Sequence, residues 1–274
     1  MSALQASLVL AFLIIVAIVV FSWSGFRLKK ALAKPFIAEW QLILRRNLPV
    51  YSRLPNELRE QLERNIKQFL HQKQFSGSNG LVVTDEMRVT IAAYACLLLL
   101  NRETGVYPQL KYIIIYPDAF RVERQETDEA GLVSTQERGL SGESWSNGKV
   151  ILSWANVVEG NRDLNDGNNV TLHEFAHQLD GENGAVNGAP ILGSAGRYEQ
   201  WSTILSKEFE SLQEAAWSGD RALLNSYGAT NPAEFFAVVT EHFFEQPEAL
   251  AKQHPELFEV FRNYYQVDPA EWHD

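Results

Sequence analysis

The pattern His173-Glu174-x-x-His177 constrains this chain more than any other feature of its sequence. In an α-helix, two histidines four residues apart lie one turn apart on one face, where both can reach a single ion. Neutral imidazole nitrogens bind zinc at about 2.0–2.1 Å, so two such side chains can share one ion. Glu174 lies beside the first histidine, where its carboxylate can act as general base on a water at the metal. The segment therefore predicts a helix that carries part of a zinc site.

The residues around this pattern favour a helix with an apolar face. Asn168 or Asn169 can cap its start, and Gly181 can end it. The apolar face would consist of Leu172, Phe175, Ala176 and Leu179. Under random residue order the pattern is expected in about one such sequence in a hundred, so by itself it leaves a solvent-facing helix with two ordinary histidines as the alternative. A third ligand would strengthen the prediction.

A third ligand is expected because a catalytic zinc site usually combines three protein ligands with one open position. The acidic candidates are Asp180, Glu182, Glu199, Glu234 and Glu241. Asp180 follows His177 by three residues, so it suits a hydrogen bond to a ligating imidazole better than ligation itself. The alternative for Asp180 is a residue of the last helical turn. Glu182 lies just beyond the predicted helix end, and Glu199 has no distinguishing context.

Glu234 has the most informative surroundings of these candidates. Asn231 can cap a helix, Pro232 suits its first turn, and the apolar segment AEFFAVVTEHFF continues it. Glu234 then lies in the first turn, where a carboxylate is also expected simply to stabilise the helix dipole. Glu241 lies on the same helix face two turns later, as an alternative ligand or as a hydrogen-bond partner of a ligand.

The segment ASLVLAFLIIVAIVVFSWSGF, from Ala6 to Phe26, contains no charged residue. It is about as long as a membrane-crossing helix, which needs about 20 residues. Arg27, Lys29 and Lys30 follow it and no Lys or Arg precedes it, so the positive-inside rule places the C-terminal side in the cytoplasm. A cleaved signal peptide has the reverse charge order, and a buried soluble helix is the remaining alternative. We expect a single-pass protein of the inner (cytoplasmic) membrane, with its catalytic domain facing the cytoplasm.

Three regions follow from this pattern: an N-terminal transmembrane anchor at 1–30, a basic juxtamembrane segment at 31–53, and one catalytic domain at 54–274. The basic segment is amphipathic and ends in RRNLPV. The domain begins with a leucine-containing helical pattern. A strongly apolar helix, capped by Thr84 or Asp85, comes next.

The centre and the end of the domain differ in their patterns. β-branched and aromatic residues at Tyr112–Pro117 and Lys149–Trp154 predict two strands, with polar loops or a hairpin between them. From Tyr198 onward the chain predicts helices, interrupted near Gly228 and Pro247. Short strands followed by a run of helices indicate an α+β domain, mostly helical with a small sheet.

Composition excludes some classes of protein. The net charge of −10 argues against a nucleic-acid partner, which needs a basic face. Cys96 is the only cysteine, so no internal disulfide can form, which fits a reducing compartment. The apolar residues around Cys96 predict that it is a small buried side chain.

The segments HEFAHQLD and YGATNPAEFFAVVTEHFF together resemble the Mlc titration factor A family of zinc-dependent aminopeptidases. The segments GLVVTDEMRVTIAAYACLLLLNRE, YPDAF, GESWSNGKVILSW and DGNNVTLHEFAHQLDGENG extend the similarity over roughly 54–261. A more distant similarity is to lethal-factor-type metalloproteases. The resemblance implies a zincin-like metallopeptidase domain of the gluzincin type, with zinc as its cofactor and a peptide as its substrate.

The resemblance also implies a role for each matching residue. His173, His177 and Glu234 would bind zinc, Glu174 would be the catalytic base, and Tyr227 would stabilise the oxyanion. Thermolysin-like relatives carry an acid four residues after the third ligand, whereas this chain has Val238 there. The outer acid must therefore come from elsewhere, and Asp180 is the first choice. The N-terminal membrane segment is a second departure, since the best-known soluble members lack one.

Three alternatives accompany this interpretation. In zincins the strand before the zinc helix runs along the cleft and pairs with an extended peptide, so 149–154 is either such an edge strand or an interior strand. The family takes its name from sequestering a transcriptional repressor. A regulatory protein that binds a repressor, with zinc mainly structural, is therefore the alternative function, although Glu174 favours catalysis. Hydrolysis of a non-peptide amide is a third possibility.

Overall fold

The computed structural model describes residues 5, 12, 25–102, 104–127, 133–140, 142–145, 148–163 and 165–272. The predicted membrane span, residues 6–26, lies almost entirely outside this part of the chain. Among the described residues, no helix combines the length and the apolar character needed to cross a membrane.

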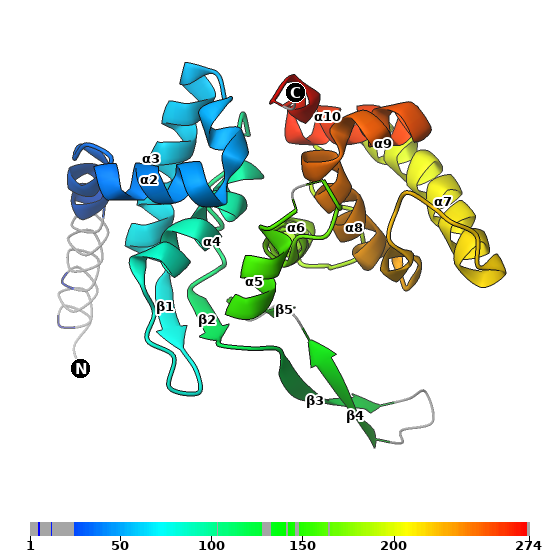
Figure 1. Cartoon of the computed structure of the whole chain (residues 1–274), viewed down its shortest axis with the longest axis horizontal. Helices are drawn as coiled ribbons and strands as arrows, with labels where there is room; N and C mark the ends of the chain where they lie inside the picture. Colours follow the sequence, from blue (N-terminus) through cyan, green and yellow to red (C-terminus); the bar gives the residue numbers. More distant parts are fainter. Residues whose placement is uncertain are drawn as a thin grey trace.

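A four-stranded sheet lies at the centre of the domain (Figure 1). Its strands are β1 (Gln74–Gly77), β2 (Tyr112–Tyr116), β6 (Lys149–Ser153) and β5 (Gly142–Trp145), in the order β1-β2-β6-β5. The first three strands are parallel, and β5 pairs antiparallel with β6. The predicted strands at 112–117 and 149–154 are confirmed as β2 and β6.

Of the two alternatives for 149–154, the interior strand is confirmed and the edge strand is wrong. β6 pairs with β2 on one side and with β5 on the other, so its amide groups are engaged within the sheet. The physical reason is that Gly142–Trp145 returns antiparallel and covers the outer side of β6. The edge strand on this side of the described sheet is therefore β5.

A second, two-stranded sheet confirms the predicted hairpin between β2 and β6. It consists of β3 (Phe120–Thr127) and β4 (Val133–Leu140), which pair antiparallel. After β6 the chain turns into the short helix α5 (Trp154–Gly160). This helix was not predicted, and the Ser153 side chain caps it by accepting a hydrogen bond from the backbone N–H of Asn156.

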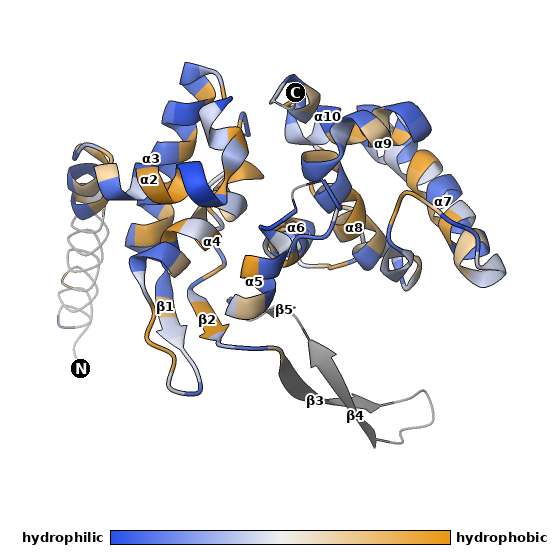
Figure 2. Cartoon of the chain, viewed as in Figure 1, coloured by the Kyte–Doolittle hydropathy of each residue, from blue (hydrophilic) through white to orange (hydrophobic). Residues whose placement is uncertain are grey.

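Three helices precede or flank the sheet on its N-terminal side. They are α2 (Ala38–Asn47), α3 (Asn56–Gln72) and α4 (Asp85–Leu97). The predicted Thr84 cap of α4 is confirmed, because its side chain accepts a hydrogen bond from the Met87 N–H. Nearly every residue of α4 is buried, whereas α3 buries one face only, as expected from its alternation of hydrophobic and hydrophilic residues (Figure 2).

The C-terminal part of the domain is helical, as predicted. It contains α7 (Ala195–Ser218), α8 (Pro232–Glu245), α9 (Pro247–Gln253) and α10 (Pro255–Tyr265). The short 3-10 turn at Ser226–Ala229 and Pro247 at the start of α9 account for the two predicted interruptions. Asn231 caps α8 and Pro232 is its first residue, both as predicted.

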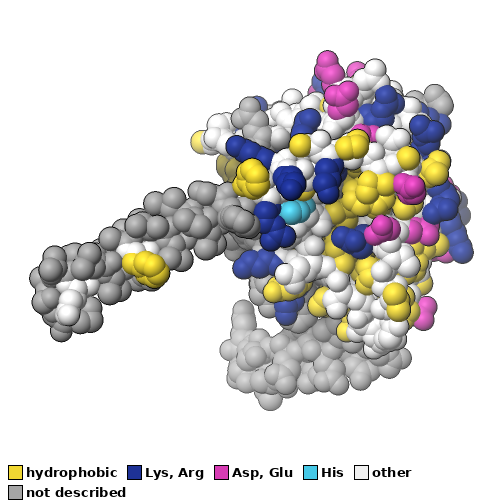
Figure 3. All heavy atoms as spheres, turned by 90° about the vertical axis from the view of Figure 1, so that its left-hand side faces the viewer, with side chains coloured by type: hydrophobic (Ala, Val, Ile, Leu, Met, Phe, Trp, Pro, Cys, Tyr) yellow, Lys and Arg dark blue, Asp and Glu magenta, His cyan; other side chains and the backbone are white. Residues whose placement is uncertain are grey.

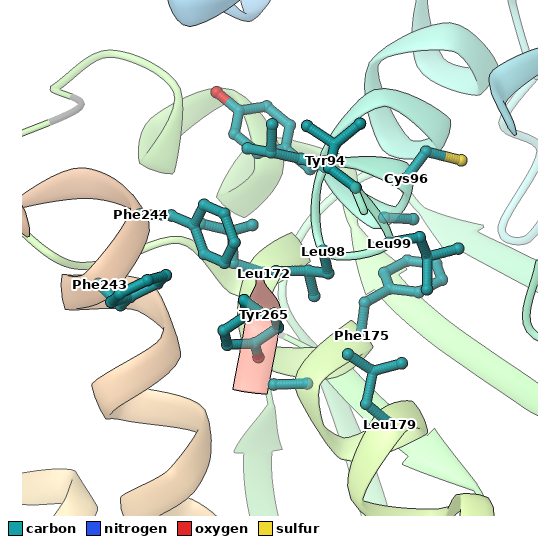
Figure 4. Close-up of a cluster of buried hydrophobic side chains, with 14 of the residues drawn as sticks. Tyr94, Cys96, Leu98, Leu99, Leu172, Phe175, Leu179, Phe243, Phe244 and Tyr265 are labelled. Carbon is teal, nitrogen blue, oxygen red and sulfur yellow. The ribbon is translucent and has the colours of Figure 1, made fainter. Parts of the chain in front are cut away.

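One hydrophobic core joins the two parts (Figure 4). Side chains from α4, the zinc-motif helix, α8 and α10 meet there, among them Tyr94, Cys96, Leu172, Phe175, Phe243, Phe244 and Tyr265. Cys96 is fully buried, and burial raises the pKa of its thiol. This packing holds the motif helix between α4 and α8.

Candidate metal centre

The motif helix is α6 (Val170–Asp180). Its cap is Asn169, whose side-chain oxygen accepts hydrogen bonds from the N–H groups of Thr171 and Leu172. The helix ends at Gly181, so both predicted boundaries are confirmed. Leu172, Phe175, Ala176 and Leu179 are all buried, which orients the opposite face, with the histidines, toward α8.

Three side chains from α6 and α8 converge on one point. Nε2 of His173 lies 2.9 Å from Oε2 of Glu234 and 3.2 Å from Nε2 of His177. Nε2 of His177 lies 3.3 Å from the same Glu234 oxygen. The three predicted ligand residues are therefore brought together, and they form the single His, Cys, Asp and Glu cluster that could hold a metal ion within the described part of the chain.

The position of Glu234 follows from the start of α8. The Asn231 side chain accepts hydrogen bonds from the N–H groups of Ala233 and Glu234, so the first turn is well formed. α8 packs directly against α6. Among the candidate third ligands, Glu234 alone has a carboxylate oxygen in contact with both histidines.

Electrostatics bind these groups tightly to one another. Burial acts to lower the pKa of His173, but its hydrogen bonds to the Glu234 and Glu241 carboxylates outweigh burial and raise that pKa well above its usual range. Burial acts to raise the pKa of Glu234, but hydrogen bonds and charge interactions with His173 and His177 outweigh burial and lower it. The site therefore concentrates negative charge around two imidazoles, as a cation site requires.

Glu241 lies at the Nδ1 side of His173, away from the cluster of ligand atoms. Its Oε1 lies 2.8 Å from Nδ1 of His173, so the imidazole donates from Nδ1, and a metal ion at the cluster would take the place of the proton on Nε2. Glu241 is 4 % exposed, and it also accepts a hydrogen bond from the backbone N–H of Asn169. The carboxylate that Val238 cannot supply is thus supplied by Glu241, at a later position of the same helix.

Asp180, the predicted outer acid, makes no hydrogen bond to His177 among the described residues, although its charge interacts with that histidine. Its Oδ2 accepts a hydrogen bond of 2.7 Å from the N–H of Gly188, and thereby it holds the loop that follows α6. The Nδ1 atom of His177 is buried and has no hydrogen-bond partner among the described residues. The two histidines therefore differ at Nδ1: His173 has the Glu241 carboxylate as its partner there, and His177 has no such partner among the described residues.

A further buried acid, Glu245, was not predicted. Its Oε1 accepts a hydrogen bond of 2.9 Å from Nδ2 of Asn169, and its Oε2 accepts one of 3.1 Å from the N–H of Asn168. Burial, with a smaller contribution from the charge of Glu241, raises the pKa of Glu245 to about 9. The spacing of Glu241 and Glu245, one helical turn apart, was the only sequence signal for this pair.

The two predicted catalytic side chains both lie at the cluster. Glu174 is 5 % exposed, and its negative charge contributes to raising the pKa of His173. Tyr227 belongs to the 3-10 turn before α8, and its ring centroid lies 5.8 Å from that of His173. Tyr227 is 47 % exposed, so it borders the site on the solvent side.

The remaining acidic candidates lie elsewhere. Glu182 forms an ion pair of 3.3 Å with the largely buried Arg102, and Glu199 is exposed on α7. Neither carboxylate belongs to the cluster of ligand atoms. The arrangement of two histidines and Glu234, with an acid beside them and a phenol at the rim, can bind a metal ion and act on a polar substrate bond.

Comparison with known proteins identifies the family. The model of the glucose-regulated metallopeptidases, M90, matches residues 23–266. The chain belongs to the M90 family. The match covers the sheet, α6 and α8, so all the residues of the cluster lie within the M90 region. Membership of a metallopeptidase family implies a metal, in agreement with the geometry.

Individual M90 relatives cover most of the chain. An uncharacterized protein of Synechocystis sp. is 42 % identical over 248 residues, 90 % of each chain. Mlc titration factor A of Pectobacterium atrosepticum is 33 % identical over 85 % of this chain and 87 % of that protein. Mlc titration factor A of Serratia proteamaculans is 34 % identical over 85 % and 88 %, respectively. These M90 relatives confirm the resemblance to the Mlc titration factor A family.

Proposed function

We propose that this protein is a membrane-anchored, zinc-dependent metallopeptidase, of the aminopeptidase type. The observation that carries the proposal is the triangle of ligand atoms of His173, His177 and Glu234, with edges of 2.9, 3.2 and 3.3 Å. Ligands at about 2.0–2.1 Å from a tetrahedral zinc ion are separated by about 3.3 Å. The donor set of two imidazoles and one carboxylate is also that of zinc peptidases with one open position.

Zinc bound by these three residues would supply Lewis-acid chemistry, by lowering the pKa of a water to about 7 and by polarising a carbonyl oxygen. The protein contributes the orientation of the ligands. Glu241 selects the tautomer of His173, because it accepts the Nδ1 proton and directs the Nε2 lone pair forward. Asn169 orients Glu241 in turn.

Glu174 is proposed as the general base. It follows His173 directly in α6, and its burial keeps bulk water away from its carboxylate. In the proposed reaction Glu174 takes a proton from the attacking water while the water oxygen bonds to the scissile carbonyl carbon. Glu174 then delivers the proton to the leaving amine as the C–N bond breaks.

Tyr227 is proposed as the oxyanion donor. Its phenol lies on the open side of His173, where a substrate carbonyl must approach. The negative charge on that oxygen grows in the transition state, and a phenol O–H directed at it stabilises the transition state more than the substrate.

An extended peptide can bind along β5, the antiparallel edge strand of the sheet. β5 packs against α6, so a peptide paired with its outer edge would run beside the proposed zinc site. Main-chain hydrogen bonds of this kind are independent of sequence and suit an enzyme that acts on peptide substrates.

The proposal includes attachment to the inner membrane by residues 6–26, with the domain in the cytoplasm. It rests on the uncharged apolar run and on the basic residues that follow it. Protection of the domain from external protease in intact cells, and resistance of the full chain to alkaline extraction, are the expected results.

A regulatory role is the second candidate, and it rests on the name of the relatives. Proteins called Mlc titration factor A share 33 % identity with this chain over most of its length. The same domain would then bind a repressor protein, with the metal serving mainly to hold α6 to α8. A metal held for structure alone does not require a base such as Glu174 beside it.

The experiment that separates the two uses the full chain, purified in mild detergent. We expect about one zinc ion per chain and hydrolysis of aminoacyl and internally quenched peptides. Glu174→Gln should retain zinc but lose about 10²–10⁴-fold in turnover, because it cannot accept a proton. Glu199→Gln, an exposed control, should be unaffected. Wild-type turnover by zinc-loaded Glu174→Gln would refute the peptidase mechanism and leave repressor binding as the function.

A further inference from the structure

The charge of this chain is unevenly distributed. Residues 25–73 contain 11 of the 24 Lys and Arg residues but only four of the 34 Asp and Glu residues, a net charge of +7. Residues 1–24 carry no charged side chain. Because the whole chain has a net charge of −10, residues 74–274 carry −17. An acidic protein therefore has one distinctly basic region.

Much of this charge is exposed and uncompensated. Within residues 25–73, six exposed cations form no ion pair with a described residue: Arg27, Lys29, Lys30, Lys34, Arg45 and Arg64. Elsewhere on the surface, Lys207 and Arg262 each pair with a nearby glutamate, whereas Arg197, Arg221 and Lys252 are exposed without an ion pair to a described residue. Figure 3 shows Lys and Arg side chains gathered on this face, with hydrophobic side chains between them.

The basic region is a fixed surface and not a loose tail. Residues 25–32 are helical, and the end of this helix is held by Lys67 of α3, whose Nζ donates to the carbonyls of Leu32 and Lys34 at 2.6 Å each. Arg64 lies one turn before Lys67 on the same face of α3. The cations of 27–34 and those of α3 are thereby held side by side.

Exposed apolar side chains belong to the same region. Leu42 is 66 % exposed and Ile37 is 45 % exposed. The combination of cations with protruding apolar groups suits the boundary between lipid headgroups and acyl chains. The phosphates of a nucleic acid would bind the cations, but they would make no favourable contact with exposed aliphatic side chains such as Leu42 and Ile37.

We infer that residues 27–72 form a docking face that binds the anionic headgroups of the membrane in which residues 6–26 are anchored. The inference rests on the anchorage proposed above and not on peptide hydrolysis. The basic helix follows the apolar segment without a linker, so the face lies within reach of the lipid surface. In Figure 1, α6 and α8 lie on the other side of α4 from this face, and α4 packs against both α3 and α6. Docking therefore leaves the metal centre turned away from the lipid.

The test places a fluorescent probe on the face of the full chain. Leu42→Cys is labelled with an environment-sensitive dye; Cys96, the only native cysteine, is fully buried and does not compete. The protein is reconstituted into nanodiscs of phosphatidylcholine alone or with added phosphatidylglycerol. We expect a several-fold brighter probe in the anionic discs, and loss of this difference in 1 M salt, where the screening length is only about 3 Å.

Matched variants assign the effect to the face. Lys34→Glu, Arg45→Glu and Arg64→Glu combined should lower the docked-to-undocked ratio by on the order of a hundredfold, since each cation contributes about fivefold at an anionic surface. Arg197→Glu, Arg221→Glu and Lys252→Glu, which alter exposed cations outside this face, should leave the signal unchanged. A probe at Trp217→Cys, a position 94 % exposed on α7, should not respond to lipid charge.

The possible outcomes separate the proposals. Equal probe fluorescence in neutral and anionic discs, or an equal response at position 217, would overturn the docking face. A response to a DNA duplex but not to lipid would assign the face to nucleic acid and overturn the inference as well. A chain that fails to enter neutral discs but is retained by anionic ones would refute the anchor and support docking. Peptide hydrolysis by the same preparations reports independently on the metal centre.

Discussion

Helices α6 and α8 meet at the metal centre, but they contribute to it in different ways. α6 presents His173, Glu174 and His177 within two turns, so helical geometry alone sets their relation. α8 presents Glu234 and Glu241, which lie 61 and 68 positions from His173 in the chain. Their relation to the histidines depends on how the two helices pack. The arrangement of the α6 residues is therefore set by local helix geometry, whereas the position of the α8 residues is set by tertiary packing.

The same comparison distinguishes the two histidines. His173 has Glu241 of α8 behind it, whereas Nδ1 of buried His177 contacts no hydrogen-bonding partner among the described residues. α8 thus provides a hydrogen-bond acceptor for Nδ1 of His173 alone, but its Glu234 carboxylate contacts Nε2 of both histidines. Four changes test how much of the site depends on α8 and on the turn that precedes it.

Glu234→Ala should have the largest effect. It removes the one carboxylate that touches both histidines, so zinc affinity should fall by more than the roughly 10–100-fold expected for loss of an outer partner. Metal content after dialysis, measured by atomic emission, checks this. Glu248→Ala, an exposed change at the start of α9, is the control. Full retention of zinc would transfer the third ligand position to Glu241.

Tyr227→Phe tests the turn that leads into α8. Loss of one oxyanion donor costs about 10²–10³-fold in turnover in a well-studied enzyme, and we expect a decrease of this order in kcat with little change in KM. Zinc content should remain at the wild-type level, because the phenol is not a ligand in the proposed site. Tyr112→Phe, at an exposed position on β2, is the matched control. Unchanged kcat would remove Tyr227 from the mechanism while leaving Glu174 in place.

Glu241→Gln tests the outer support from α8. An amide offers only one acceptor oxygen, so it cannot serve both Nδ1 of His173 and the N–H of Asn169. Zinc affinity should decrease by about 10–100-fold, with the fold retained as judged by circular dichroism. Competition with a zinc chelator measures this. An affinity equal to that of the wild type would show that His173 does not need its partner.

Glu245 should affect stability and not catalysis. Its pKa in the folded protein is raised to about 9 from its ordinary value of 4.5, so the folded state binds this proton more tightly than the unfolded state. Its favourable contribution is complete below about pH 4.5 and is lost as the pH rises toward 9. The resulting slope is at most about 1.4 kcal/mol per pH unit. The melting temperature should decline with pH over this range, and Glu245→Gln should flatten the decline; a flat wild-type profile would contradict the assignment.

Most of the local structure was predictable from the sequence. The caps Thr84, Asn169 and Asn231 and the helices that they begin were identified correctly, because a cap and its helix lie within one turn of chain. The strands β2 and β6 were recognised from their β-branched and aromatic residues. The short α5 was missed, since seven residues from Trp154 to Gly160 show too little periodicity to identify a helix.

The arrangement of these elements was decided only by the tertiary structure. The residues of β6 suit either an edge or an interior position, and pairing with β5 on its outer side settled the matter. In the same way, Asp180 and Glu241 were both suitable partners for a ligating histidine. The packing of α8 on α6 brought Glu241 to Nδ1 of His173, while Asp180 turned to Gly188. The sequence by itself determined which side chains share a helix face, because backbone geometry repeats over a few residues. It did not determine which faces meet, because that depends on the packing of the whole core.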